Sequence, residues 1–317
     1  MAQPEDLVPD AEAVAFEVES AEAVTARLAS ALAPVLARTL AAWAGGQTGA
    51  QLRAAITSAL SRVKWPAMNP LLAGVAEDAV QLGVARATRG LLADDRRKLR
   101  RRPARPDPLD PVDLDALTRA RLRQVKDLVA TLPLETKRDV DAVLGKVSAV
   151  RSRAEGQARW TANEGLNAGT SAVARSIGRN LLWVPERDAC LHCLAYAGWA
   201  VRPGESFPPG LTFGDAPVER PDGILYPPLH PGCRCQVKTY PGKPGPPAED
   251  GSAVDPAAAL AREARRSVVY GWTAHASQAA TLRAMSRLLE EGANLPASVE
   301  RRARTLLRAG KTQPRRA

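Results

Sequence analysis

A chain of 317 residues is long enough for two or three domains and for a sizeable buried core. Its formal net charge of +10 comes from two basic segments, residues 91–106 and 251–317, and this uneven charge argues against a uniformly basic protein. The start of the chain has neither a basic nor an apolar leader, so we do not expect the 4 cysteines to form disulfides in an oxidising compartment.

Residues 10–44 have apolar side chains at steps of mostly three and four, which predicts a long amphipathic helix. Gly45 and Gly46 end this helix, and Pro34 is expected to kink it. Because Arg38 interrupts the apolar stretch and no continuous apolar run reaches about 18 residues, we expect no membrane span.

A second helical block is predicted from residue 48 to residue 102, with breaks at Trp65-Pro66 and Asn69-Pro70. It ends in a basic run, residues 91–106, with seven cationic side chains against two aspartates, followed by a proline-rich hinge. One interpretation of the run is a solvated helix end; the other is contact with nucleic-acid phosphates. The candidate residues for that contact are Arg96, Arg97, Lys98, Arg100, Arg101 and Arg102.

Helical patterns continue over residues 114–132 and from Pro133 to about residue 178. Four glycines interrupt the second pattern, so close packing or a break is expected at Gly145, Gly156, Gly165 and Gly169. Residues 181–184 then predict a strand that leads into the cysteines.

All four cysteines lie in two pairs inside residues 181–240, which we call the cysteine module. Cys190 and Cys193 have the spacing that lets a tight turn aim both sulfurs at one metal ion. Cys233 and Cys235 would share one face of a strand that continues through residues 236–238. The pattern predicts a structural Zn²⁺ site with four sulfurs, with His230 as the fourth ligand should one cysteine stand aside.

Three other interpretations of the cysteines are weaker. Two disulfides would require an oxidising compartment, and a redox C-x-x-C would require a βαβ context, whereas helices precede the first pair and a proline-rich loop follows it. A zinc deaminase would need H-x-E upstream and proline before the first cysteine, but the first histidine is His192 and Ala189 precedes Cys190. The cysteine module is also rich in aromatic residues, which predicts a small dense core that a metal would help to stabilise.

Two segments of the chain resemble the phage Mu F-like head morphogenesis family, the MuF-like minor capsid proteins. They are H-P-G-C-R-C at residues 230–235 and W-x-P-E-R-D-x-C-x-x-C at residues 183–193, preceded by A-R-W-T-A-N-E-G-L-N-A-G at residues 158–169. The acidic residue often found after the threonine of this helical segment is Ala162 here. The resemblance covers about residues 150–240. It implies a virion protein near the portal, needed for head assembly and without an established catalytic residue.

After the cysteine module, a Gly/Pro-rich stretch predicts an extended, flexible linker, followed by three short helical patterns in a basic tail. The predicted fold is mainly α, with a helical N-terminal region, a small α+β zinc-stapled module and a helical basic tail. We expect an N-terminal helical domain (1–105), a helical segment leading into the motif (106–180), the cysteine module (181–240), the linker (241–254) and the tail (255–317).

The expected function is that of a minor capsid protein of a tailed phage, in the capsid interior or portal region and in the host cytoplasm during assembly. Its expected partners are the portal protein, other capsid or scaffold proteins and non-specific double-stranded DNA, with no membrane. A nucleic-acid-binding zinc protein is the alternative, although few basic residues surround the cysteines. A metal-dependent or cysteine enzyme is less favoured, because a site with four sulfurs leaves no open position for water.

Overall fold

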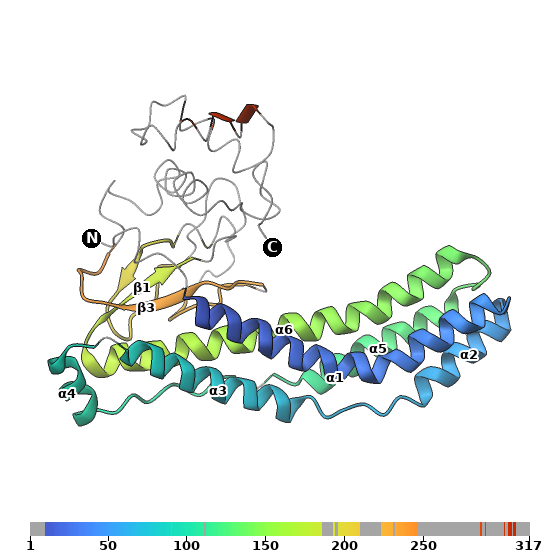
Figure 1. Ribbon diagram of the computed structural model, residues 1–317, viewed down its shortest axis with the longest axis horizontal. Helices are drawn as coiled ribbons and strands as arrows, with labels where there is room; N and C mark the ends of the chain where they lie inside the picture. The colour runs from blue at the N-terminus through green and yellow to red at the C-terminus, as the bar shows by residue number, and fades with distance from the viewer. Residues whose placement is uncertain are drawn as a thin grey trace. The chain divides into compact units, whose positions relative to one another are not determined.

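The computed structural model describes residues 10–89, 91–110, 112–185, 193, 196–209, 223–230, 232–245 and seven separate residues of the tail (286, 289, 301, 304, 305, 307 and 308). The fold is mainly helical with one small sheet, as predicted (Figure 1). The helices are α1 (Ala11–Ala44), α2 (Gly49–Ser61), α3 (Asn69–Thr88), α4 (Ala93–Arg101), α5 (Leu114–Thr131) and α6 (Lys137–Ile177). The strands are β1 (Asn180–Val184), β2 (Ala200–Val201) and β3 (Gln236–Tyr240).

The chain divides into two compact units. The helical unit comprises Ala15–Asp78 and Leu109–Ala162, and the mixed unit comprises Met1–Val14, Ala79–Pro108 and Asn163–Ala317. Each unit combines stretches that are not consecutive in sequence, whereas the predicted domains are consecutive; their boundaries stay predictions. The seven described residues of the tail are helical, and the rest of the three helical patterns predicted there lies outside the described residues.

The helical unit is built from the apolar stripes of α1, α2, α5 and α6. On α1, Ala21, Val24, Leu28, Leu32 and Val35 are buried at steps of three and four, as the amphipathic pattern predicts. Pro34 lies inside α1, which continues to Ala44. By length and composition α1 is the one helix of the described chain that could cross a membrane, a property that apolar core helices of soluble proteins share.

Two of the helix ends in this unit are held by polar side chains. Figure 1 shows α2 and α5 side by side, and Arg53 of α2 donates to the carbonyl of Val129 at 3.1 Å and to that of Leu132 at 2.7 Å, at the end of α5. The Asp115 carboxylate accepts from the backbone N–H of Met68 at 2.8 Å, and the Asn69 side-chain oxygen accepts from the N–H of Asp115 at 3.0 Å. The predicted break at Trp65-Pro66 is confirmed, because α2 ends at Ser61 and α3 begins at Asn69. The Asn69-Pro70 pair marks the end of this break and opens α3, because proline is tolerated in the first turn of a helix.

In the mixed unit, α3 and α6 approach each other at two glycines. A Cβ atom on Gly169 would lie 2.3 Å from the carbonyl oxygen of Val80, and one on Gly83 would lie 2.2 Å from the carbonyl oxygen of Leu166. Of the two outcomes predicted for the glycines of α6, close packing is therefore found at Gly169. Gly145 has no neighbouring atom within 4 Å of its Cβ position, and α6 is continuous there.

The sheet of the mixed unit is antiparallel, with β1 between β2 and β3 (Figure 1). Its β1 strand confirms the strand predicted at residues 181–184. The ring of Trp183 on β1 stacks on Tyr196 at 4.7 Å and meets Phe207 edge-on at 5.0 Å, between ring centroids. Cys193 and Cys233 are buried in the same hydrophobic cluster, so the predicted aromatic core includes these cysteines.

Candidate metal centre

A tight turn brings together two candidate ligands of the H-P-G-C-R-C motif, His230 and Cys233. The carbonyl of His230 accepts a hydrogen bond from the N–H of Cys233 at 2.9 Å, and Gly232 has φ +81°. A positive φ suits glycine, because residues with a side chain rarely adopt it. The turn places the imidazole and the thiol that flank it near one point.

Cys193 completes a group of three possible ligands. Its Sγ lies 3.2 Å from Nε2 of His230 and 3.5 Å from Sγ of Cys233, and all three ligand atoms lie within 4.8 Å of one another. Both cysteines are buried, with 1% and 4% of their surface exposed, and His230 is half-buried. These three side chains lie close enough together to hold one metal ion.

The protonation state of Cys233 suits a metal ligand. Burial raises the pKa of its thiol, but the thiols of Cys193 and Cys235 and backbone hydrogen bonds at Leu229 and Cys235 outweigh burial and hold this pKa well below its ordinary value. Since the thiolate is the form that binds metals, the surroundings of Cys233 favour coordination. None of the three cysteines of the described residues, Cys193, Cys233 and Cys235, is joined in a disulfide.

The four-sulfur set remains a prediction. Cys190 lies outside the described residues, as does His192. Cys235 is 1% exposed and its thiol contacts that of Cys233, but within the described residues it is not one of the three mutually close ligands. The predicted strand through Cys233 was wrong, because β3 begins only at Gln236 and the turn at Gly232 sets the direction of Cys233.

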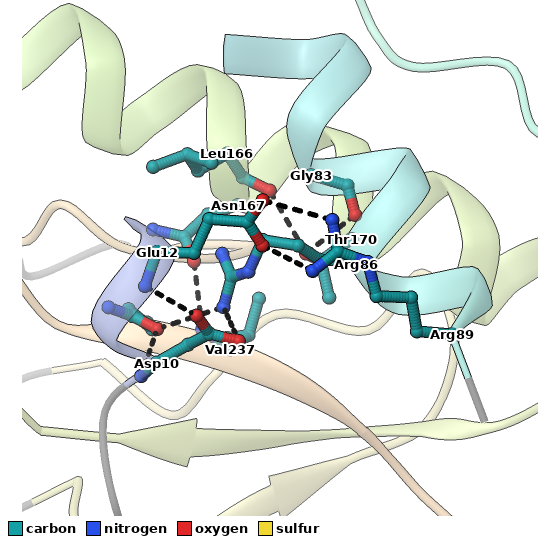
Figure 2. A network of polar contacts seen from close by, with 10 residues as sticks. Asp10, Glu12, Gly83, Arg86, Arg89, Leu166, Asn167, Thr170 and Val237 are labelled. Atoms are coloured by element: carbon teal, nitrogen blue, oxygen red, sulfur yellow. Dashed lines mark hydrogen bonds and ion pairs between the residues drawn. The ribbon is translucent and has the colours of Figure 1, made fainter. Parts of the chain in front are cut away.

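Two asparagines of α6, which the sequence interpretation missed, hold the segment that carries the cysteines. The carbonyl of Cys235 accepts from the side-chain amides of Asn163 at 3.0 Å and Asn167 at 3.1 Å. In return, the side-chain oxygen of Asn167 accepts from the N–H of Val237 at 2.8 Å (Figure 2). An asparagine pair one turn apart inside a long helix was the available signal, because asparagine is a poor helix former.

A second polar network fixes the start of β3. The side-chain oxygen of Gln236 accepts from the N–H of Asp10 at 3.1 Å and from Arg86 at 3.2 Å, and Arg86 forms an ion pair with Asp10 at 3.0 Å. Burial raises the pKa of the Asp10 carboxyl, but Arg86 and nearby backbone N–H groups lower it by more than burial raises it. The pKa of Asp10 therefore lies below its ordinary value. Figure 2 shows Glu12 and Arg89 beside this network, where they form an exposed ion pair. Gln236 is thus bound by Asp10, just before α1, and by Arg86 of α3, while α6 binds the residues on either side of it, Cys235 and Val237.

The basic run lies on α4 and the segment that follows it. Arg96, Arg97, Lys98, Arg100, Arg101 and Arg102 are all exposed. Among them, Arg97 pairs with Asp94, and Lys98 pairs with Asp95 at 3.3 Å. Asp95 is only 3% exposed and also receives two hydrogen bonds from Arg179, at 2.8 and 2.9 Å. Lys98 therefore takes part in anchoring α4, whereas contact of the run with nucleic acid stays a prediction.

Comparisons of the chain with protein-family models, with curated proteins and with solved structures find no match.

Proposed function

We propose that the cluster of Cys193, His230 and Cys233 holds one Zn²⁺ that stabilises the cysteine module without taking part in a reaction. Two thiols and an imidazole are the ligand types that zinc shares with few other common ions, and their buried position suits a closed structural site. The fourth ligand is Cys190 or Cys235. The ion would tie the turn at Gly232 to Cys193, which lies 40 residues away from Cys233 in sequence.

We further propose that the protein is a MuF-like minor capsid protein with a structural role in head assembly near the portal. The observation that supports this proposal is the meeting of the two halves of the motif: C-x-x-C supplies Cys193, and H-P-G-C-R-C supplies His230 and Cys233. The third segment of the resemblance supplies Asn163 and Asn167, which bind the carbonyl of Cys235. The quoted residues thus support one another through contacts, which favours a single functional unit over a chance similarity. The proposed location is the capsid interior or portal region.

Metal analysis of the purified chain tests the zinc proposal. We expect one zinc per chain, and an X-ray absorption spectrum with three sulfurs and one nitrogen around it. Cys233→Ser should lower the metal content and make the cysteine module sensitive to protease while the helical unit resists. Cys190→Ser and Cys235→Ser compared side by side identify the fourth ligand. A chain that carries no metal, and whose Cys233→Ser variant melts like the parent, would rule out the zinc site.

Quantitative mass spectrometry of purified phage particles tests the head role. We expect a few copies per capsid, present in procapsids and mature particles that also contain the portal protein. A protein missing from both kinds of particle would contradict the head role without affecting the zinc proposal.

A non-specific DNA-binding protein is the second candidate function. It is favoured by one observation, the exposure of the six candidate cations that lie on α4 and at its C-terminal end. The same property would serve a protein inside a DNA-filled head, so the two functions are compatible.

A further inference from the structure

A hollow of about 420 Å³ lies in the mixed unit, between the end of α4, the segment that follows it and the last turns of α6. Its lining is dominated by guanidinium groups: Arg101, Arg102, Pro103, Arg105, Ala172, Arg175 and Ser176. A volume of this size falls in the range of about 300–1,000 Å³ typical of pockets that bind small molecules.

The hollow has a strong excess of positive charge. Arg175 forms an ion pair with Asp107 at 2.9 Å. For Arg101, Arg102 and Arg105, which are exposed, no carboxylate of the described chain lies within ion-pairing distance. Four guanidinium groups and one neighbouring carboxylate leave a net charge of about +3 around a concave surface, which concentrates anions.

The walls of the hollow are held in place before any ligand arrives. Arg175 also donates to the backbone carbonyl of Arg105 at 3.2 Å, which fixes the segment after Pro103 against α6. The buried carboxylate of Asp95 binds Arg179, which follows α6, and Lys98 donates to the carbonyl of Ile177 at 3.4 Å. Because α4 is thus tied to the end of α6, binding an anion requires little ordering of the backbone.

We propose that this hollow binds phosphate groups of a nucleic-acid backbone. Guanidinium groups donate two parallel hydrogen bonds to phosphate oxygens, and no carboxylate of the described residues engages three of the four here. The inference deepens the DNA-binding part of the proposed function: of the six candidate cations it retains only Arg101 and Arg102 in the contact, and it adds Arg105 and Arg175. It depends neither on the zinc site nor on a location in the virion.

The test compares two variants that remove the same charge. Arg102→Gln/Arg105→Gln changes two residues of the hollow, and the control, Arg96→Gln/Arg100→Gln, changes two exposed arginines of α4 that do not line it. Binding of the full chain to a fluorescent DNA duplex of arbitrary sequence is followed by anisotropy between about 50 and 200 mM salt. The variant of the hollow should lose about tenfold or more in affinity and lower the salt slope by about 2, since each phosphate contact contributes about 1. The control should lose no more than about threefold.

Equal losses in both pairs would mean that the duplex senses only the diffuse charge of α4, and this would overturn the site. Unchanged binding of the hollow variant would overturn it as well. Titration with inorganic phosphate alone distinguishes a site for nucleic-acid phosphates from a site for the free phosphate ion. If phosphate binds the parent and not the variant while duplex binding stays equal, the hollow is a site for a free anion and the inference is wrong. Thermal unfolding and zinc content of each variant confirm that the fold is intact, and Arg102→Lys/Arg105→Lys should restore part of the affinity because it retains the charge.

Discussion

Replacing a glycine of α6 by alanine should have opposite effects on stability at two positions. It should destabilise the protein at Gly169, where α6 contacts α3, and stabilise it at Gly156, which has no close neighbour. At Gly169, the new Cβ of alanine would lie 2.3 Å from the carbonyl oxygen of Val80 and 2.8 Å from the amide nitrogen of Val84. Both are backbone atoms, so the helices must move apart. We expect a cost at the upper end of the 1–3 kcal/mol typical of overpacking, offset by about 1 kcal/mol of helix propensity. The net loss is about 2 kcal/mol.

The matched control is Gly156→Ala in the same helix, where the Cβ would meet no atom within 4 Å. There only the gain in helix propensity remains, which amounts to about 0.5–1 kcal/mol. Calorimetry should show a transition of the mixed unit about 4 °C or more lower for Gly169→Ala, and no lowering for Gly156→Ala. Since Asn167 lies two residues from Gly169, the first variant should also release the proposed Zn²⁺ more readily. If both substitutions raise the transition temperature, α3 and α6 do not approach as closely as described.

Three further variants test the polar contacts. Asn167→Leu leaves the buried N–H of Val237 without its acceptor, so we expect a loss of about 2 kcal/mol in denaturant unfolding. If the proposed Zn²⁺ is bound, a chelator titration should show a roughly tenfold weaker affinity for it. Asp95→Asn leaves Arg179 and Lys98 without their carboxylate. Because both cations retain access to water, we expect the unfolding free energy to fall by only about 2 kcal/mol near pH 7, measured by chemical denaturation. Burial raises the pKa of Asp95, but Arg179 and Lys98 lower it more. The ionised carboxylate therefore contributes to stability above about pH 4, and this contribution is lost as the pH falls through the lowered folded pKa. The difference in unfolding free energy between parent and variant should therefore disappear in acid. Glu12→Gln removes an exposed ion pair with Arg89 and should leave the unfolding midpoint within error, whereas a clear loss would mean that the pair is less solvated than the structure indicates.

Local patterns in the sequence predicted the elements whose signals are local. The start of α5 agrees with the predicted residue 114, since the Asp113 side chain accepts from the N–H of Ala116 and fixes the first turn. The end of α1 at Ala44 agrees because two glycines follow. The proximity of Cys193, His230 and Cys233 was predictable because cysteine and histidine are rare in this chain and their spacing is distinctive.

What the sequence did not reveal depends on pairs of residues that are distant in the chain. Asp95 and Arg179 are separated by 84 positions, and Asn167 and Cys235 by 68, so no periodicity links them. The direction of Cys233 was misread because the turn at Gly232 competes with the strand pattern, and the turn prevails. Close packing was one of two outcomes expected at the glycines of α6, and it is found at Gly169. The sequence did not indicate that the other helix would be α3 or that Gly83 would lie at the contact.

The chain beyond β3 has a consequence for any attempt to produce the cysteine module as a separate fragment. Gly245 exchanges two backbone hydrogen bonds with Ala200, at 2.7 and 2.9 Å, so the first residues of the predicted linker cover the outer side of β2. A fragment that stops at Tyr240 would uncover this side of the sheet. Uncovered strand edges recruit strands from other molecules, and such a fragment should therefore self-associate at concentrations where one extended to residue 245 stays monodisperse.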